Sequence, residues 1–190
     1  MIDIESKRDM NNNYKLIFTG PVGAGKTTAI RSISDSPPVT TDAVATDMTQ
    51  NIKETTTVAM DYGIMQLEGG ERLHLYGTPG QERFNFMWDI LTEGGIGLIL
   101  LLDNTRADPF QDMHFFLNSF KDFIDSTHLA IGITQTDRCA TPRIDEYHEQ
   151  LRRTGLKVPI FEIDARERRD VVVLVEALLF SLAPDLRVPA

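Results

Sequence analysis

The stretch Gly20-Pro21-Val22-Gly23-Ala24-Gly25-Lys26-Thr27 constrains this chain more than any other part of it. It has the spacing G-x-x-x-x-G-K-[ST], and it lies between an apolar run at 14–19 and helix-forming residues at 28–31. Glycines at these positions let the backbone curl so that successive N–H groups point inward, toward phosphate oxygens. The N-terminus of a following helix adds free N–H groups and about half a positive charge. Strand, glycine loop and helix in this order predict a site for a nucleoside triphosphate.

Two side chains of this loop have distinct expected roles. Lys26 would reach the β- and γ-phosphates, and the hydroxyl of Thr27 would ligate Mg²⁺. The rest of the expected phosphate cradle consists of Gly20, Val22, Gly23, Ala24, Gly25 and Thr28. A glycine-rich turn without a ligand is the alternative, and the complete octapeptide between a strand and a helix argues against it.

Length and composition favour a single soluble domain. A chain of 190 residues fits one domain, with a flexible leader at 1–13 and the nucleotide-binding domain at 14–190. The net charge of −9 argues against a nucleic-acid-binding surface. Cys139 is the only cysteine, which excludes a disulfide framework. The leader has no apolar segment of the kind found in signal peptides, and the apolar run at 96–102 is too short to span a bilayer. We therefore expect a cytoplasmic protein without direct membrane insertion.

Apolar runs alternate with helical patterns along the chain. Strands are expected at 14–19, 58–67, 72–76, 97–102, 129–134 and 158–163. Helices are expected from the glycine loop to about Ser34, and at 84–91, 108–126, 143–154 and 170–182. Residues 35–56 show no period and are expected to form a long functional loop. This order predicts an α/β fold with a mixed, mostly parallel six-stranded sheet, helices on both faces, and ligands at the strand C-termini.

From Tyr14 to about Leu182 the chain resembles a Ras-like small GTPase, a P-loop NTPase, with its loops in the expected order. Thr57-Val58-Ala59-Met60-Asp61-Tyr62-Gly63 is similar to the Rab-type pattern T-I-G-V-D-F-G. The resemblance implies that Thr57, in switch I, closes over the γ-phosphate and ligates Mg²⁺ in the triphosphate state. Two preceding threonines leave this register open by one or two positions, and a threonine run before a strand also fits simple β-propensity.

The next element, D-x-x-G-Q-E, reads Gly77-Thr78-Pro79-Gly80-Gln81-Glu82, followed by Arg83-Phe84. The resemblance implies that the Gly80 N–H bonds the γ-phosphate and that Gln81 orients the attacking water. The leading Asp, which normally holds a Mg²⁺-bound water, is replaced by Gly77. Asp61, on the neighbouring expected strand, is a candidate substitute through water, and an ordinary exposed strand residue is the alternative. Departure at this Asp is a trait of the prokaryotic GTPases related to the gliding-motility GTPase, which the whole run resembles.

The base-recognition element N-K-x-D is similar to Thr134-Gln135-Thr136-Asp137. The Asp137 carboxylate would accept from guanine N1–H and the 2-amino group. Adenine offers neither donor, so the carboxylate would stay unpaired, and polar mismatches of this kind can discriminate by roughly 10⁴-fold. Gln135 keeps an aliphatic stem against the base but lacks the usual lysine charge. A plain turn after a strand is the alternative.

Two further segments, at 164–166 and at Asp103, have possible roles in nucleotide or metal binding. Asp164-Ala165-Arg166 is similar to the S-A-K element, and the resemblance implies that the Ala165 N–H contacts guanine O6. Asp103 ends an apolar strand like a Walker-B aspartate, which binds Mg²⁺ in many ATPases. Ras-like proteins commonly carry an Asp at this place without metal contact.

The residues around the second switch bear on rate and partners. Val22 stands where many Ras proteins have glycine, and its branched side chain would crowd Gln81 or an arginine finger, so slow hydrolysis is expected. Arg83 is a candidate finger in cis. On a helix Phe84 and Trp88 share a face and Phe86 points elsewhere, which fits either core packing or a partner-binding patch.

Together these features predict a GTP-binding switch with slow Mg²⁺-dependent hydrolysis, in which Lys26 and Gln81 are the catalytic residues. The resemblance implies regulators and effectors at both switches, a regulator of the roadblock type, and a prokaryotic signalling role. One alternative is a P-loop ATPase or nucleotide kinase that uses Asp103. Another is a scaffold that holds GTP or GDP without hydrolysis, which Gly77 and Val22 suggest.

Overall fold

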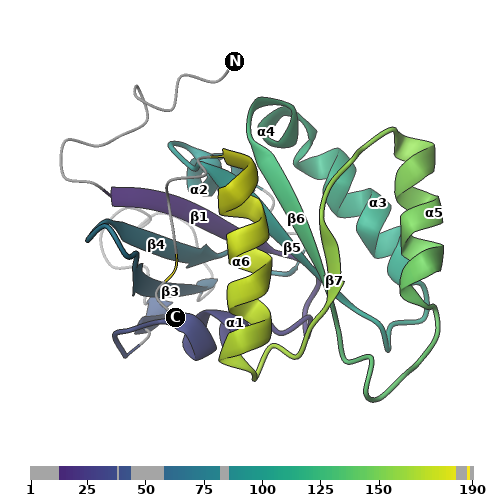
Figure 1. The fold of residues 1–190 in the computed structure, drawn as a ribbon, viewed down its shortest axis with the longest axis horizontal. Helices are drawn as coiled ribbons and strands as arrows, with labels where there is room; N and C mark the ends of the chain where they lie inside the picture. The colour runs from purple at the N-terminus through teal and green to yellow at the C-terminus, as the bar shows by residue number, and fades with distance from the viewer. Residues whose placement is uncertain (1–12, 38, 44–57, 82–85, 183–187, 189–190) are drawn as a thin grey trace, which may run out of the picture.

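The computed structural model describes residues 13–37, 39–43, 58–81, 86–182 and 188. In these ranges a central sheet carries helices on both faces (Figure 1). The strands are β1 (Asn13–Thr19), β2 (Val39–Ala43), β3 (Val58–Gln66), β4 (Arg72–Gly77), β5 (Gly97–Asp103), β6 (His128–Thr134) and β7 (Ile160–Glu162). The helices are α1 (Lys26–Ile33), α2 (Phe86–Thr92), α3 (Pro109–Ser119), α4 (Lys121–Ser126), α5 (Ile144–Thr154) and α6 (Arg168–Leu182).

The sheet has the strand order β2-β3-β4-β1-β5-β6-β7. The pairs from β4 to β7 are parallel, and β2, β3 and β4 pair antiparallel. The mixed, mostly parallel α/β fold is therefore confirmed, and all six expected strands are present. β2 adds a seventh at the edge, inside the segment that was expected to be a loop. Its five residues have no sequence pattern that predicts a strand, and the strand is defined by its antiparallel pairing with β3.

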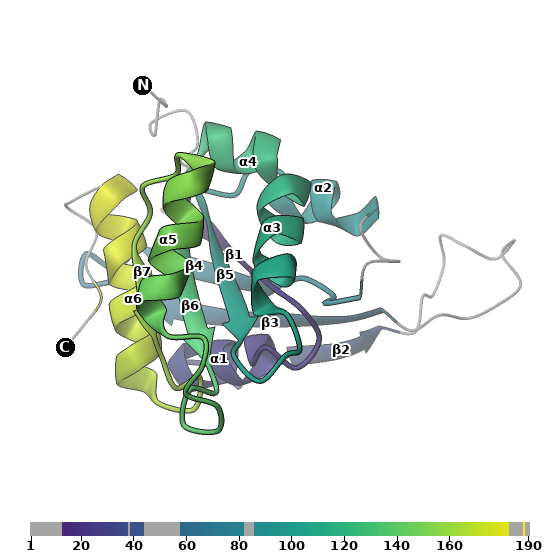
Figure 2. The same cartoon turned by 90° about the vertical axis from the view of Figure 1, so that its right-hand side faces the viewer.

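Each face of the sheet packs on its own set of helices. Along β1, Leu16 and Phe18 join the core beneath α1 and α6, whereas Ile17 faces the core beneath α2 to α5. All seven residues of β5 are buried, as expected for a strand covered on both faces. Figure 2 shows α6 on one side of the sheet and α2 and α3 on the other. Because β1, β5 and β6 pair in parallel, their C-terminal ends lie at the same edge of the sheet.

One expected helix is wrong in its extent. The segment 108–126 divides into α3 and α4 at Phe120, whose φ of −103° and ψ of 17° leave helical geometry. The Phe120 ring is buried and stacks on Trp88 of α2 at a centroid distance of 4.8 Å. Tertiary packing of the aromatic ring accompanies a break that the helical period of the sequence does not reveal.

Other boundaries agree more closely with expectation. α1 ends at Ile33 with Ser34 as its cap, and the Gly69-Gly70 turn joins β3 to β4 in an antiparallel hairpin. β7 is shorter than the run at 158–163, and α6 begins two residues early, at Arg168. Among the described residues, no helix combines the length and apolar character needed to cross a membrane.

Candidate nucleotide-binding site

Two glycines of the loop between β1 and α1 lie close to neighbouring segments and have positive φ. Gly20 has a φ of 137°, and a Cβ atom there would lie 2.0 Å from the carbonyl oxygen of Leu101 in β5. Gly25 has a φ of 91°, and its Cβ would lie 3.0 Å from the Cβ of Ala165. A side chain is therefore excluded at Gly20, and at Gly25 it would combine a tight contact with a strained positive φ. The loop lies directly against the ends of β5 and the 164–166 segment.

Lys26 is the first residue of α1, and its side chain crosses back over the loop. It is 8% exposed, and its Nζ donates to the carbonyl oxygens of Gly20 and Pro21, each at 2.7 Å. Burial lowers the pKa of the Lys26 ammonium to about 8, against an opposing electrostatic effect of the Asp61 carboxylate. A partly desolvated cation at the mouth of an N–H-rich loop is well placed to pair with a phosphate.

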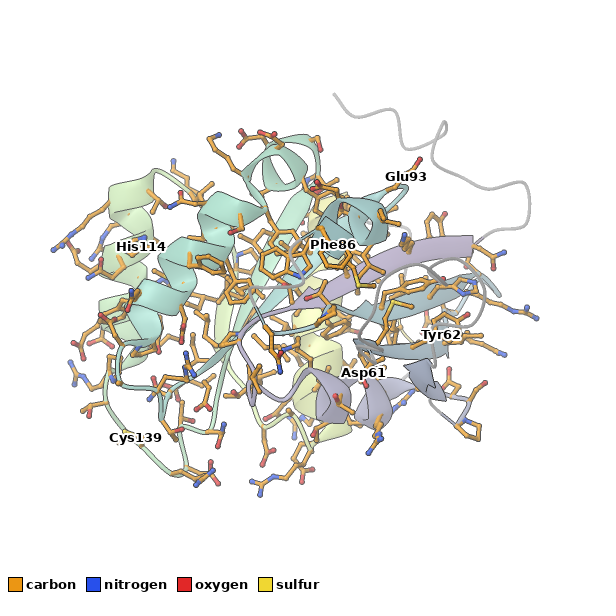
Figure 3. All side chains as sticks on the ribbon, turned by 180° about the vertical axis from the view of Figure 1, so that it is seen from behind. Asp61, Tyr62, Phe86, Glu93, His114 and Cys139 are labelled. Carbon is orange, nitrogen blue, oxygen red and sulfur yellow. The ribbon has the colours of Figure 1, made fainter. Side chains whose placement is uncertain are left out.

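Thr27 and Asp61 meet across the start of α1. The Thr27 hydroxyl donates to Asp61 Oδ2 at 2.5 Å. Asp61 lies on β3 directly opposite Gly77 of β4, and Figure 3 shows Asp61 beside α1. A Cβ built on Gly77 would lie 3.0 Å from the Asp61 Cβ and 3.1 Å from Ile30 Cδ1. The Asp61 side chain thus occupies the space that an aspartate at position 77 would need.

The segment after β4 is hydrogen-bonded to the end of β1 and lies against the phosphate loop. The Thr78 N–H donates to the Phe18 carbonyl at 2.8 Å, and its hydroxyl shares a hydrogen bond with Thr19 at 2.9 Å. A Cβ on Gly80 would come within 2.7 Å of the Val22 nitrogen and 2.8 Å of Lys26 Nζ. Gly80 therefore lies against the loop, with Gln81 exposed next to it. This arrangement brings three predicted residues, Val22, Lys26 and Gly80, together.

The end of β6 joins the same loop from the other side. Thr134 is buried, and its hydroxyl is 3.1 Å from both the Ala24 and the Leu102 carbonyl oxygens. Gln135 has a φ of 59°, and its Nε2 donates to the Gly23 carbonyl at 3.2 Å. The segment predicted to recognise the base is therefore hydrogen-bonded to the segment predicted to hold the phosphates.

A cavity of about 230 Å³ lies where these loops converge. Its lining consists of Gly23, Gly25, Thr28, Thr134, Gln135, Asp137, Arg138, Asp164, Ala165 and Arg166. Within it the Arg166 guanidinium bonds Asp164 at 2.6 Å and reaches Asp137 at 3.2 Å. The hydrogen bonds from Arg166 lower the pKa of the Asp164 carboxyl. The cavity thus combines loop backbone, an acceptor carboxylate and a cation.

Asp103 serves the backbone of its own turn. Its Oδ1 accepts from the Thr105 N–H at 2.8 Å and from the Thr105 hydroxyl at 2.6 Å. The acidic partner of Thr27 is Asp61 instead. This geometry fits a turn-forming role for Asp103 better than that of a metal ligand.

The aromatic residues after the second switch have different environments. Trp88 is 3% exposed and its Nε1 donates to the Pro79 carbonyl at 3.3 Å, so it is a core residue. Phe86 is 63% exposed on α2. Thr57, Arg83 and Phe84 lie outside the described residues, and their expected roles stay predictions.

Asn104 and Tyr147 have no role predicted from the sequence. Asn104 is 1% exposed at the end of β5, and Tyr147 is fully buried on α5. The Tyr147 hydroxyl donates to Asn104 Oδ1 at 2.7 Å. The sequence contains one indication of such a role: Asn104 directly follows a continuous apolar strand. A buried amide at this place needs hydrogen-bond partners from elsewhere in the chain.

Comparison with known proteins agrees with a nucleotide-binding assignment. Residues 36–135, more than half of the chain, match the family described as "Conserved hypothetical ATP binding protein". The match begins after the phosphate loop and includes Asp61, Gly80 and Thr134. The mixed sheet with its glycine loop between β1 and α1 is consistent with a P-loop NTPase fold.

Individual relatives have low sequence identity to this chain. Ras-related protein RabC of Dictyostelium discoideum is 22% identical over 180 residues, which cover 92% of this chain and 86% of that protein. Ras-related protein Rab-13 of Rattus norvegicus is 26% identical over 181 residues, covering 91% of this chain and 79% of that protein. Uncharacterized protein MJ1339 of Methanocaldococcus jannaschii is 27% identical over 101 residues, which cover 53% of this chain and 58% of that protein.

Restoring an aspartate at position 77 tests the packing of Asp61. We expect Gly77→Asp to lower the free energy of unfolding by about 1–3 kcal/mol, because its side chain overpacks against Asp61 and Ile30 and adds a like charge. Asp61→Gly combined with Gly77→Asp should recover much of this loss. Urea denaturation of both single variants and the double variant measures the coupling. Strictly additive changes would contradict the shared space.

Proposed function

We propose that this chain, which belongs to the family described as "Conserved hypothetical ATP binding protein", binds a nucleoside triphosphate and hydrolyses it slowly. The observation that carries the proposal is a cavity in which Gly23, Gly25 and Thr28 adjoin Asp137 and Ala165. One part supplies backbone N–H groups for phosphates, and the other supplies polar groups for a base.

The proposed base is guanine. Asp137 offers a carboxylate that suits two adjacent N–H donors, and Ala165 offers a backbone N–H for the O6 oxygen. The contact of Asp137 with Arg166 is long, at 3.2 Å, and both side chains are more than half exposed, so a base competes with a weak ion pair. The distant relatives RabC and Rab-13 bear the description Ras-related, which agrees with this preference.

The proposed metal is Mg²⁺. Thr27 and Asp61 place a hydroxyl and a carboxylate oxygen 2.5 Å apart, and Mg²⁺ prefers oxygen ligands. No cluster of three or more His, Cys, Asp or Glu suited to a metal occurs among the described residues. We assign Thr27 as a ligand, Asp61 as a partner through water, and Thr57 as a further ligand.

Catalysis would depend on positioning and electrostatic stabilisation. Magnesium, when bound, would neutralise charge on the phosphate oxygens. Lys26 would exchange its two backbone acceptors for phosphate oxygens, Gly80 would present its N–H, and Gln81 would orient water from its exposed position. Ordering of the Thr57 and Gly80 loops would signal the triphosphate state.

The cellular role follows only from the resemblance to small GTPases. We place the chain with the prokaryotic branch related to the gliding-motility GTPase, in the cytoplasm, with regulators and effectors at the two switches. Phe86, exposed on α2 next to the second switch, is a candidate contact for such a partner. A regulator of the roadblock type belongs to the same analogy.

Adenine nucleotides are the second candidate, because the family description names ATP. An ATPase or nucleotide kinase using Asp103 would need that carboxylate at the metal, whereas it bonds Thr105. A scaffold that holds GTP or GDP without hydrolysis is the third candidate, and Gly77 and Val22 suggest it.

Base selection is the decisive test. We expect the protein to bind GDP and GTP at least tenfold more tightly than ADP and ATP, measured by calorimetry with nucleotide-free protein. Asp137→Asn should shift preference toward xanthosine nucleotides, because an amide can donate to the 2-oxo group. Asp145→Asn, an exposed carboxylate in an ion pair with Arg143, is the matched control. Equal affinity for adenine and guanine nucleotides would overturn the guanine assignment.

Metal removal tests the Thr27–Asp61 pair. Chelation by EDTA should accelerate GDP release at least tenfold in the unaltered protein, because the phosphates lose their bridging cation. Asp61→Ala should release GDP faster with Mg²⁺ present and respond less to EDTA. Asp125→Ala, an exposed carboxylate on α4, is the control. An Asp61→Ala variant with unchanged Mg²⁺ dependence would remove Asp61 from the metal site.

Val22 tests the expected slow hydrolysis. Its side chain is 56% exposed and its backbone nitrogen lies beside Gly80, so it stands near the water that Gln81 would orient. We expect Val22→Gly to raise the single-turnover rate of GTP hydrolysis several-fold, and Gln81→Leu to lower it. An unchanged rate in Val22→Gly would show that crowding by this side chain does not limit hydrolysis.

A further inference from the structure

A buried asparagine connects the two ends of the predicted base-recognition loop. Asn104 follows β5, and its backbone N–H donates to the Thr134 carbonyl at 3.0 Å. Its side-chain Nδ2 donates to the Cys139 carbonyl at 2.6 Å and to the Pro142 carbonyl at 3.1 Å. One residue thus contacts the segment 134–142 where it leaves β6 and again shortly before α5 begins.

Tyr147 determines which way the Asn104 amide faces. Its hydroxyl donates to Asn104 Oδ1 at 2.7 Å, so the NH₂ group is left to face the two loop carbonyls. The Tyr147 ring is fully buried and packs edge-on against Phe110 at a centroid distance of 4.9 Å. Burial raises the pKa of the Tyr147 hydroxyl above its ordinary value, and the hydroxyl is a donor at physiological pH with or without this shift.

Asp137 lies between these anchor points, in a turn where the Gln135 carbonyl accepts from the N–H groups of Arg138 and Cys139. Its side chain is 59% exposed, and the side-chain contact that the structure gives it is the long ion pair with Arg166. Packing of the side chain itself therefore contributes little to its position. The backbone on its N-terminal side is tied down by Thr134 and Gln135, and the backbone on its C-terminal side by Asn104.

We propose that Asn104 and Tyr147 are positioning residues for base selection: together they hold the loop that carries Asp137 in register with the phosphate loop. The proposal rests on the proposed function, in which Asp137 accepts from the guanine base. Two hydrogen bonds to a rigid planar edge tolerate little displacement of the carboxylate. Loosening the loop at residues 139–142 should therefore weaken contacts to the base while leaving the phosphate contacts of residues 20–27 intact.

The test compares three ligands on the full chain in the presence of Mg²⁺: GDP, inosine diphosphate and tripolyphosphate. Inosine diphosphate lacks the 2-amino group that Asp137 would contact. The ratio of the GDP and inosine diphosphate affinities therefore measures the contact between the Asp137 carboxylate and that amino group. Tripolyphosphate has no base, and its affinity reports the phosphate loop alone. Urea denaturation of each variant confirms that it folds cooperatively.

Two variants alter the side-chain hydrogen bonds of Asn104 to different extents. Asn104→Asp keeps the shape and the acceptor for Tyr147, but sets a carboxylate oxygen against the carbonyls of Cys139 and Pro142. Tyr147→Phe removes only the hydroxyl and keeps the buried ring. Tyr14→Phe, at a 4% exposed tyrosine near the start of β1 and away from the strand ends that form the site, is the matched control.

We expect Asn104→Asp to reduce the preference for GDP over inosine diphosphate at least fivefold, Tyr147→Phe to reduce it about two- to fivefold, and Tyr14→Phe to leave it unchanged. Tripolyphosphate affinity should stay within about twofold throughout, because a hydrogen bond of this kind contributes modestly and locally. Should Asn104→Asp fail to fold, Tyr147→Phe carries the test.

Two results would overturn the proposal. One is an unchanged nucleotide preference in folded Tyr147→Phe and Asn104→Asp proteins. The other is an equal loss of affinity for GDP and tripolyphosphate, which would show that the network supports the fold as a whole. Failure of the proposed function gives a different result, because the unaltered protein would then not prefer GDP over inosine diphosphate at all.

Discussion

The candidate site depends on how closely the phosphate loop packs against the ends of the neighbouring strands. Gly20 lies so near the Leu101 carbonyl oxygen that any side chain would collide with it, and a Cβ on Gly25 would lie only 3.0 Å from the Ala165 Cβ. Because the loop lies this close, Thr134 can bond its Ala24 carbonyl from β6. The strands of a parallel sheet end together at one edge, and this contact turns that edge into a single cavity.

Asp61 and Gly77 are paired across β3 and β4, and only one of the two positions has room for a side chain. Opposite residues of an antiparallel pair have side chains that share the same region of space. Gly77 of β4 has no side chain, and the Asp61 side chain of β3 lies in the space opposite it. Glycine fits position 77 because a side chain there would meet Asp61 and Ile30.

Local signals sufficed for much of the fold. Continuous apolar runs marked β5 and β6, and Gly69-Gly70 marked the hairpin that joins β3 to β4. They were insufficient for β2, whose hydrogen bonds come from β3, and for the break at Phe120, whose ring stacks on Trp88. In both cases the deciding interaction joins residues far apart in the chain.

The sequence by itself determined the phosphate loop, since glycine spacing between a strand and a helix is a local property of the backbone. It also placed Thr134 to Asp137 after a buried strand, and so at the same edge of the sheet. Only the tertiary structure decided that Thr27 pairs with Asp61, that Asp103 bonds its own turn, and that Asn104 connects the two ends of the 134–142 loop. Each of these depends on which groups a folded chain brings within about 3 Å of one another, and hydrogen bonds are selective only at that range.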